Sequence, residues 1–154
     1  MSTQSTKLLV VNADTQVIVF NDAVNYDSDL PEYNTKDGAV QGLEPGASES
    51  EPTMWIDAMN VLLKRLAESD VNQHDILAMS VSGQQHGLVS LDAQGHLSRP
   101  RSKLWNDFAT QEECDILTEK VGGLDVMVKE VSNSQRTGYT AAKIFHMYRH
   151  EREL

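Results

Sequence analysis

The sequence predicts a mixed α/β domain, and three observations lead to this class. Two short β-branched-rich runs lie near the N-terminus, an apolar run of strand length ends in a glycine, and most later segments show helical spacing of apolar residues. The chain has 154 residues, the length of one domain, and can bury roughly two thirds of its unfolded surface. A core therefore needs no disulfide, and the single cysteine, Cys114, forms none within the chain.

The first two strands are expected to form a β-hairpin. Residues 8–11 and 17–20 are the β-branched-rich runs, and Asn12 and Asp14 lie between them as turn-forming residues. Residues 25–50 follow, acidic and interrupted by proline and glycine without sustained periodicity. We interpret this stretch as an excursion over the surface.

A helix is expected over residues 52–69. Ser50 and Glu51 lie near its cap, and Pro52 suits its first turn. Apolar residues then recur at helical spacing, which indicates that one face packs on a partner, most simply a sheet: Trp55, Ala58, Met59, Leu62, Leu63 and Leu66.

Further strands are expected in the middle of the chain. Residues 75–83 form a compact apolar run of the kind found in strands buried on both faces. Residues 88–92 predict another strand, closed by a turn at 92–95, and residues 100–105 a short one.

The C-terminal third is helical in pattern. Thr110 and Glu113 fit a capping box for a helix that ends at Gly122-Gly123. Residues 124–131 predict a shorter helix and residues 141–149 another. The apolar face of this last helix is expected to hold Ile144, Phe145 and Tyr148.

Charge and hydropathy exclude several classes of function. The formal net charge is -10, and nine acids against one base fall between Asp22 and Asp57. A nucleic-acid surface needs clustered Lys and Arg, which this chain does not show. No apolar run approaches the roughly 20 residues that span a bilayer, and the N-terminus lacks the pattern of a secretory signal. We therefore expect a cytoplasmic protein that binds neither nucleic acid nor membrane.

Polar side chains follow the apolar run at residues 83–87. In open α/β sheets, ligands bind where strands end, and glutamine and histidine offer the donors and acceptors that a polyhydroxyl ligand needs. A polar turn with a solvated His86 explains the same residues equally well. A second candidate is Trp105 with Asp107, since an indole packs on a sugar face and a carboxylate accepts hydroxyl hydrogen bonds. Alternatively, Trp105 belongs to the core and Asp107 or Thr110 caps the next helix.

Two more polar segments read as structural when taken alone. In residues 136–143, Gly138 would make a turn and Thr140 would cap the last helix. Residues 2–7 carry hydroxyls and Lys7, which suit a phosphate, although a frayed polar tail is the simpler interpretation.

The order of these four segments resembles the FGGY family of carbohydrate kinases, and within it the xylulokinase branch. The family has a phosphate loop of the form Asp-x-Gly/Ser-Thr-x-Ser-x-Lys/Arg, a sugar-binding Gln-Gln-His segment, Trp-Asn-Asp, and Thr-Gly-x-Thr-x-x-Lys. The matching residues of this chain are 2–7, 82–87, 105–107 and 137–143.

The resemblance implies a ribonuclease-H-like fold, shared with actin-like ATPases, and transfer of the ATP γ-phosphoryl, with Mg²⁺, to a ketopentose such as D-xylulose. In-line transfer depends mostly on positioning and charge neutralisation. The implied sugar-binding residues are Gln84, Gln85, His86, Trp105 and Asp107, and the implied phosphate-binding residues are Thr3, Gln4 and Lys7.

The chain also departs from the family pattern. Ala109 stands where the family has the arginine that pairs with the residue at Asp107. By the resemblance, residues 1–154 are a partial N-terminal domain that lacks the first strand and its metal-side aspartate, the Gly-Asp segment with the catalytic base, and the C-terminal ATP-binding domain. We therefore expect no catalytic residue and no metal ligand in this chain, weak ketose binding, no turnover, and no binding of ATP or Mg²⁺ by the chain alone.

A second hypothesis is a non-catalytic binding module that keeps only the fold. Apolar surface or strand edges without a cover would favour self-association, as a homo-oligomer, or association with a separate C-terminal chain.

Overall fold

Two units make up the computed structural model, which describes residues 1–152. Unit 1 comprises Met1–Gln41 and Glu51–Gln84, and unit 2 comprises Gly42–Ser50 and Gln85–Leu154. The strands form three separate two-stranded antiparallel sheets, β1–β2, β3–β4 and β5–β6, rather than one mixed sheet. Within residues 1–152, no helix is both long and apolar enough to cross a membrane.

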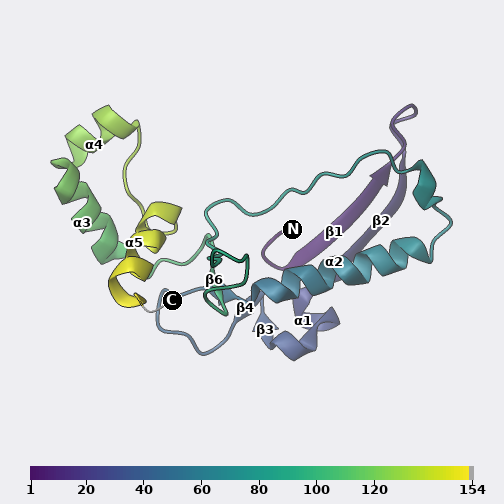
Figure 1. Cartoon of the computed structure of the whole chain (residues 1–154), viewed down its shortest axis with the longest axis horizontal. Helices are drawn as coiled ribbons and strands as arrows, with labels where there is room; N and C mark the ends of the chain where they lie inside the picture. The colour runs from purple at the N-terminus through teal and green to yellow at the C-terminus, as the bar shows by residue number, and fades with distance from the viewer. Residues whose placement is uncertain (153–154) are drawn as a thin grey trace. The chain divides into compact units, whose positions relative to one another are not determined.

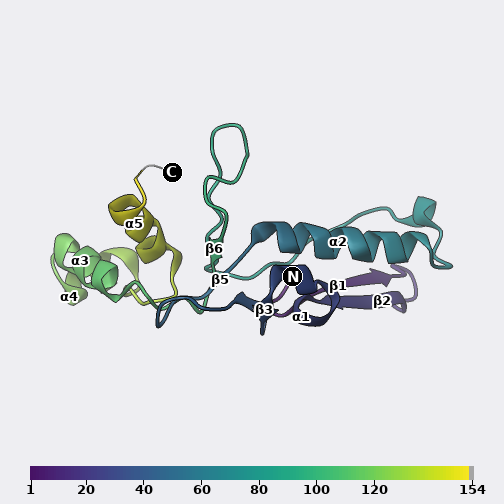
Figure 2. The ribbon, with the colours of Figure 1, turned by 90° about the horizontal axis from the view of Figure 1, so that it is seen from below.

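Unit 1 is a helix packed on a hairpin. Strand β1 (Ser5–Val11) pairs with β2 (Ile18–Asn25), which confirms the predicted hairpin and lengthens both strands. Helix α2 (Pro52–Ala67) confirms the predicted helix and forms a layer over this hairpin (Figures 1 and 2). Because side chains alternate across a strand, one face of the hairpin meets α2 and the other stays open. The core lies between these layers and comprises Val24, Tyr26, Leu30, Met54, Ala58 and Leu62.

The acidic excursion is more ordered than the sequence predicts. After the hairpin come α1 (Tyr26–Asp29), the 3-10 turn η1 (Pro31–Tyr33), β3 (Thr35–Lys36) and β4 (Ala39–Val40). The side chain of Asn25 accepts hydrogen bonds from two amides at the start of α1, so a polar residue fixes the turn out of the hairpin.

The predicted buried strand at residues 75–83 is wrong. The 3-10 turn η2 (Gln73–Asp75) leads instead into a segment without regular structure, which runs from Ile76 to Gln84 along unit 1 (Figure 1). Leu77 is 94% exposed and Met79 is 73% exposed. A strand needs a partner for its backbone N–H and C=O groups, and within residues 1–152 no strand pairs with this segment.

Unit 2 contains a short sheet and three helices. Strand β5 (Glu49–Ser50) pairs with β6 (Ser102–Lys103), which lies in the predicted strand at 100–105. The predicted strand at 88–92 is reduced to two isolated bridges, Leu88 with Lys103 and Leu91 with Leu97. The turn after it is confirmed, with the Asp92 carboxylate accepting from the Gln94 amide.

The helices of unit 2 agree with the sequence in extent but differ at their caps. They are α3 (Gln111–Val121), α4 (Leu124–Val131) and α5 (Thr140–His150). Gly122 ends α3 in the left-handed conformation, as predicted. Thr110 precedes α3 without a side-chain cap bond, so no capping box forms. Thr140 is the first residue of α5 rather than its cap.

The apolar face predicted for α5 is wrong for two of its three residues, and Phe145 is only partly buried. Ile144 is 55% exposed and Tyr148 is 63% exposed, whereas Ala142 and Lys143 are the buried residues of this helix. Helical spacing alone therefore did not identify the buried residues of α5, one of which is a lysine that donates to three backbone carbonyls.

Candidate functional site

The chain passes from unit 1 to unit 2 within the Gln-Gln-His segment, and Gln85 and His86 form a turn. Gln84 belongs to unit 1, and Gln85 and His86 belong to unit 2. His86 adopts a left-handed backbone with φ of 62°, a conformation that costs a non-glycine residue about 1 kcal/mol or more. Its ring stacks on Tyr139 with 4.5 Å between centroids and 19° between planes. The polar turn, which was the alternative interpretation of these residues, is therefore present, and the stack on Tyr139 holds its exposed imidazole.

Trp105 and Asp107 differ sharply in exposure. Trp105 is 47% exposed, so it is not a core residue and its indole retains an open surface. Asp107 is fully buried and does not cap the next helix. Its carboxylate accepts from the Ser48 amide at 3.1 Å and lies 3.7 Å from the Lys103 ammonium. Lys103 thus supplies the positive charge that Ala109 does not.

The segments around this site are joined by Lys143, a residue for which the sequence motifs imply no sugar or phosphate contact. The Lys143 ammonium is fully buried and donates to three backbone carbonyls: His86 at 2.7 Å, Leu104 at 2.5 Å and Gly138 at 2.6 Å. Burial lowers the pKa of Lys143 to about 8, partly offset by the nearby Asp107 charge. One ammonium therefore fixes the Gln-Gln-His turn, the start of the Trp-Asn-Asp segment and the turn before α5.

A glycine allows these segments to approach closely. Gly138 has φ of 88°, and a side chain there would place its Cβ 2.6 Å from the Trp105 carbonyl oxygen. The predicted turn at Gly138 is confirmed, and it also brings the backbone before α5 against Trp105. Glycine is required here on both counts.

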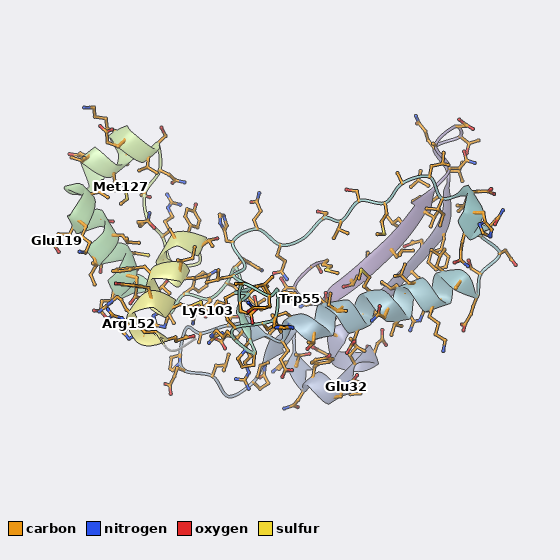
Figure 3. All side chains as sticks on the ribbon, in the orientation of Figure 1. Glu32, Trp55, Lys103, Glu119, Met127 and Arg152 are labelled. Carbon is orange, nitrogen blue, oxygen red and sulfur yellow. The ribbon has the colours of Figure 1, made fainter. Side chains whose placement is uncertain are left out.

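A buried ion-pair network supports the same region of unit 2. Glu49 accepts from Arg99 at 2.6 Å and from Lys103 at 3.3 Å, and Arg99 also pairs with Glu151 at 2.8 Å. Burial raises the pKa of Glu49, but the two cations more than offset this and hold it below its usual value. Lys103, labelled in Figure 3, connects this network to Asp107.

The candidate phosphate residues lie in unit 1, around the start of β1. The Ser2 amide donates to the Ser5 carbonyl at 2.8 Å, so the segment is an ordered turn rather than a frayed tail. Thr3 donates to the Gln84 side chain at 3.2 Å, and Gln4 donates to Asp37 at 3.1 Å. Lys7 lies exposed on β1, on the hairpin face away from α2.

Asp27, an acidic residue outside the motifs, orders the neighbouring turn at residues 35–38. The Asp27 carboxylate accepts from the Thr35 hydroxyl and from the amides of Asp37 and Gly38. Partial burial raises the pKa of Asp27, but these hydrogen bonds more than offset that and lower it overall. A Cβ at Gly38 would lie 1.8 Å from the Thr3 carbonyl oxygen, so the turn that Asp27 holds packs directly on the candidate loop.

The candidate residues thus fall into two groups. Thr3, Gln4, Lys7 and Gln84 lie in unit 1, where Thr3 and Gln84 are hydrogen-bonded to each other. Gln85, His86, Trp105 and Asp107 lie in unit 2, where Lys143 links the backbones that carry them. The signal for Lys143 was its place at the end of the Thr-Gly-x-Thr-x-x-Lys segment. No apolar pattern marks Asp27 or Glu49.

Comparison with known proteins identifies relatives along the whole chain. Residues 1–154 match the sequence model for the FGGY family of carbohydrate kinases, N-terminal domain. The chain is 30% identical to xylulose kinase 2 of Arabidopsis thaliana, covering 99% of this chain and 31% of that protein. It is 33% identical to the xylulose kinase of Streptomyces rubiginosus, covering 99% of this chain and 28% of that protein. The chain thus spans about three tenths of the length of these relatives.

Solved structures agree with the sequence relatives. A xylulose kinase from Brucella ovis superposes with a TM-score of 0.80 at 26% identity, over 99% of this chain and 29% of that one. A ligand-bound xylulose kinase from Lactobacillus acidophilus has a TM-score of 0.77 at 18% identity, over 99% and 28% respectively, which supports the fold. The ribonuclease-H-like α/β fold is therefore confirmed, and the chain belongs to the FGGY family of carbohydrate kinases.

Proposed function

We propose that residues 1–154 form the sugar-binding part of the N-terminal domain of an ATP-dependent kinase that phosphorylates a ketopentose such as D-xylulose. The observation that carries the proposal is the Lys143 ammonium, which holds the backbones of His86 and Leu104 in place. Those backbones present an imidazole and the half-exposed indole of Trp105, the pairing of polar and flat apolar groups that suits a sugar.

The buried and exposed residues take different roles in this proposal. Gln84, Gln85 and His86 hydrogen-bond the ketose hydroxyls, and Trp105 packs on the carbon skeleton. Asp107 is fully buried and already accepts the Ser48 amide, so it orders the sugar wall rather than contacting the sugar. The family resemblance implies that Asp107 binds the sugar, whereas its burial favours a supporting role.

The phosphate loop fits the terminal phosphate of ATP only in part. Thr3 and Lys7 are donors of the type that binds phosphate oxygens, and ATP would supply the phosphoryl group for transfer. Gln4, however, already donates to Asp37, a carboxylate that disfavours a neighbouring anion. In the proposal, Thr3 and Lys7 face the phosphate, Gln4 mainly positions the loop, and Mg²⁺ enters with ATP.

We expect no phosphoryl transfer by these residues alone. A general base must reach the sugar hydroxyl, and the Gly-Asp segment to which the family resemblance assigns this role does not occur in residues 1–154. Asp107, the carboxylate of the sugar segments, is buried against Lys103 and Ser48 and is not available as a general base.

The proposal further assigns the chain to the cytoplasm, where Cys114 stays reduced.

Tryptophan fluorescence tests the sugar site directly. The chain has two tryptophans, so Trp55→Phe in α2 (labelled in Figure 3) leaves Trp105 as the single reporter. Millimolar D-xylulose is expected to change the Trp105 emission of this variant with saturation. His86→Ala in the same background should weaken binding about tenfold, whereas His96→Ala, an exposed histidine on the 92–97 turn, should leave it unchanged.

Two outcomes would count against the proposal. If the Trp105 emission shows no saturable change up to about 50 mM D-xylulose, and calorimetry detects no heat of binding, the proposed sugar site is absent. Sustained ADP release in a coupled assay with ATP and D-xylulose would contradict the expected inactivity of the chain alone.

Exposed apolar surface in unit 1 supports a second candidate, a self-associating module without catalysis. Leu77, Met79 and Val81 project from the unpaired segment at 62% exposure or more, and Leu9 and Val11 are 52% exposed on the open face of the hairpin. Such surface is commonly covered by association. Weak self-association is detectable at a chain concentration of roughly 100 µM, so light scattering that shows a monomer at this concentration would exclude the self-associating module.

A further inference from the structure

Three metal-ligating side chains meet where α3 packs on α5 in unit 2, outside the sugar segments. Glu113 of α3 and His146 and His150 of α5 each offer a ligand atom, and these atoms all lie within 4.8 Å of one another. His146 and His150 are four residues apart, so both lie on the same face of α5. Glu113 is 2% exposed, which is unusual for a carboxylate unless it has cationic partners.

Two of the separations, each to a different oxygen of Glu113, are close to those between the ligands of a tetrahedral zinc ion, and all three ligand atoms lie within 4.8 Å of one another. His146 Nδ1 lies 3.5 Å from Glu113 Oε2, and His150 Nε2 lies 3.2 Å from Glu113 Oε1. Ligand atoms that are about 2.0–2.2 Å from a zinc ion at tetrahedral corners are about 3.4 Å from each other. Small side-chain rotations would bring the three atoms onto one ion, with water or a further side chain in the fourth position.

One of these atoms lacks a hydrogen-bond partner among the described residues. His146 Nδ1 is buried and lies 3.5 Å from Glu113 Oε2, but it forms no hydrogen bond with any group of residues 1–152. A buried ring nitrogen without a hydrogen bond is costly, and coordination of a metal ion would satisfy it. His150 is about half exposed, with its side chain 46% accessible, so an ion has a path from solvent.

The charges around the cluster permit a cation. Arg149 currently neutralises Glu113, with Nη1 2.6 Å from Oε1, and its other nitrogen lies 2.6 Å from the exposed Glu112. The second oxygen of Glu113 faces His146 instead, so an ion bound there would share the carboxylate with Arg149. Glu112 would hold the guanidinium, which limits the repulsion between the two cations.

We propose that Glu113, His146 and His150 form a binding site for a divalent transition-metal ion, with zinc as the best match, that fastens α5 to α3. One carboxylate oxygen and two imidazoles are the ligand set that zinc favours over Mg²⁺, which prefers oxygen ligands. The site is independent of the proposed sugar site and would act on the stability of unit 2.

Calorimetry with zinc chloride tests the site on the tag-free chain after dialysis against EDTA and then metal-free buffer at pH 7.5. The expected result is one zinc ion per chain with a dissociation constant of about 10 µM or lower, and a rise in Tm on adding zinc. Magnesium chloride at the same concentration should give neither. A cobalt(II) titration should produce visible absorption bands of a four-coordinate site.

Variants separate this site from adventitious binding. His150→Ala and Glu113→Gln should each weaken zinc binding at least tenfold and abolish the Tm rise, while His96→Ala and His74→Ala should bind as the parent chain does. His150 is half exposed, so its variant is expected to fold, and circular dichroism checks this. The proposal is overturned if the parent chain binds no zinc below about 1 mM. It is also overturned if His150→Ala and Glu113→Gln bind zinc as strongly as the parent chain does.

Discussion

Unit 1 and unit 2 are built from different kinds of buried group. The core of unit 1 is apolar, with Met54, Ala58 and Leu62 of α2 fully buried against the hairpin. In unit 2 the fully or almost fully buried set includes charged side chains: Glu49, Lys103, Asp107, Glu113 and Lys143. An apolar layer is non-directional and tolerates adjustment, whereas paired charges fix geometry through distances and hydrogen bonds.

The difference teaches where precision is needed in this fold. The backbones that carry His86 and Trp105 are held by Lys143, and Lys103 links Asp107 to Glu49. A sugar is recognised by the directions of its hydroxyls, so its binding residues require positions fixed within fractions of an ångström. The buried ion pairs and hydrogen bonds of unit 2 fix these positions. The same arrangement means that removing one charge leaves its buried partners unpaired.

The largest effect expected from this comparison is that of Glu49→Ala. The substitution leaves Arg99 and Lys103 without their shared partner in a site where all three side chains are at most 15% exposed. Breaking a buried pair by removing one partner costs about 3–5 kcal/mol. Urea unfolding measures the loss, and hydrogen exchange with mass spectrometry should place the faster exchange in peptides of unit 2.

Glu151→Ala is the matched control for Glu49→Ala. It removes only the second partner of Arg99, on a side chain that is 21% exposed, and should cost about 1 kcal/mol. If both variants lose the same free energy of unfolding, or if Glu49→Ala loses less than about 1 kcal/mol, which is the upper limit for a surface ion pair, then buried charge pairs do not hold unit 2 together.

Leu62→Ala probes the apolar core of unit 1 and is expected to cost about 3 kcal/mol. Leu62 is fully buried, and truncation loses both its transfer free energy and the filled volume. Exchange should rise in peptides of α2 and the hairpin. Leu77→Ala is the control, because Leu77 is 94% exposed and its truncation should change stability by less than about 0.5 kcal/mol. If Leu77→Ala lowers the free energy of unfolding by more than about 1 kcal/mol, the segment from Ile76 to Gln84 is covered in solution.

The elements that sequence alone predicted correctly are those with local, periodic signals. The hairpin, α2 and the stop of α3 at Gly122 follow from alternation, helical spacing and a glycine cap. The run at 75–83 failed because apolar composition cannot supply a pairing partner, and that partner is a property of the whole sheet. Thr110 failed as a capping residue because a capping motif does not ensure the side-chain bond.

The candidate site was predictable in its segments but not in its supports. The resemblance to a known family drew attention to residues 83–87 and 105–107, which unit 2 connects through Lys143. Glu49 and Lys103 are more than 50 residues apart in sequence, and neither lies in a motif. Contacts of this kind depend on tertiary pairing of charges, which no pattern within a single segment encodes.

The smallest effect is the pH dependence that Lys143 confers. Its pKa is about 8 in the folded chain against 10.5 for a free lysine, so between these values the unfolded chain holds a proton that the folded chain has released. The free energy of unfolding should therefore rise with pH in this window, by about 1 kcal/mol at pH 9 relative to Lys143→Met, and not below pH 7. Parallel urea titrations of the two chains measure the difference. NMR of the Lys143 ε-methylene should give a midpoint near 8, whereas a midpoint above 10 would mean that its three carbonyl acceptors outweigh burial and stabilise the charged form.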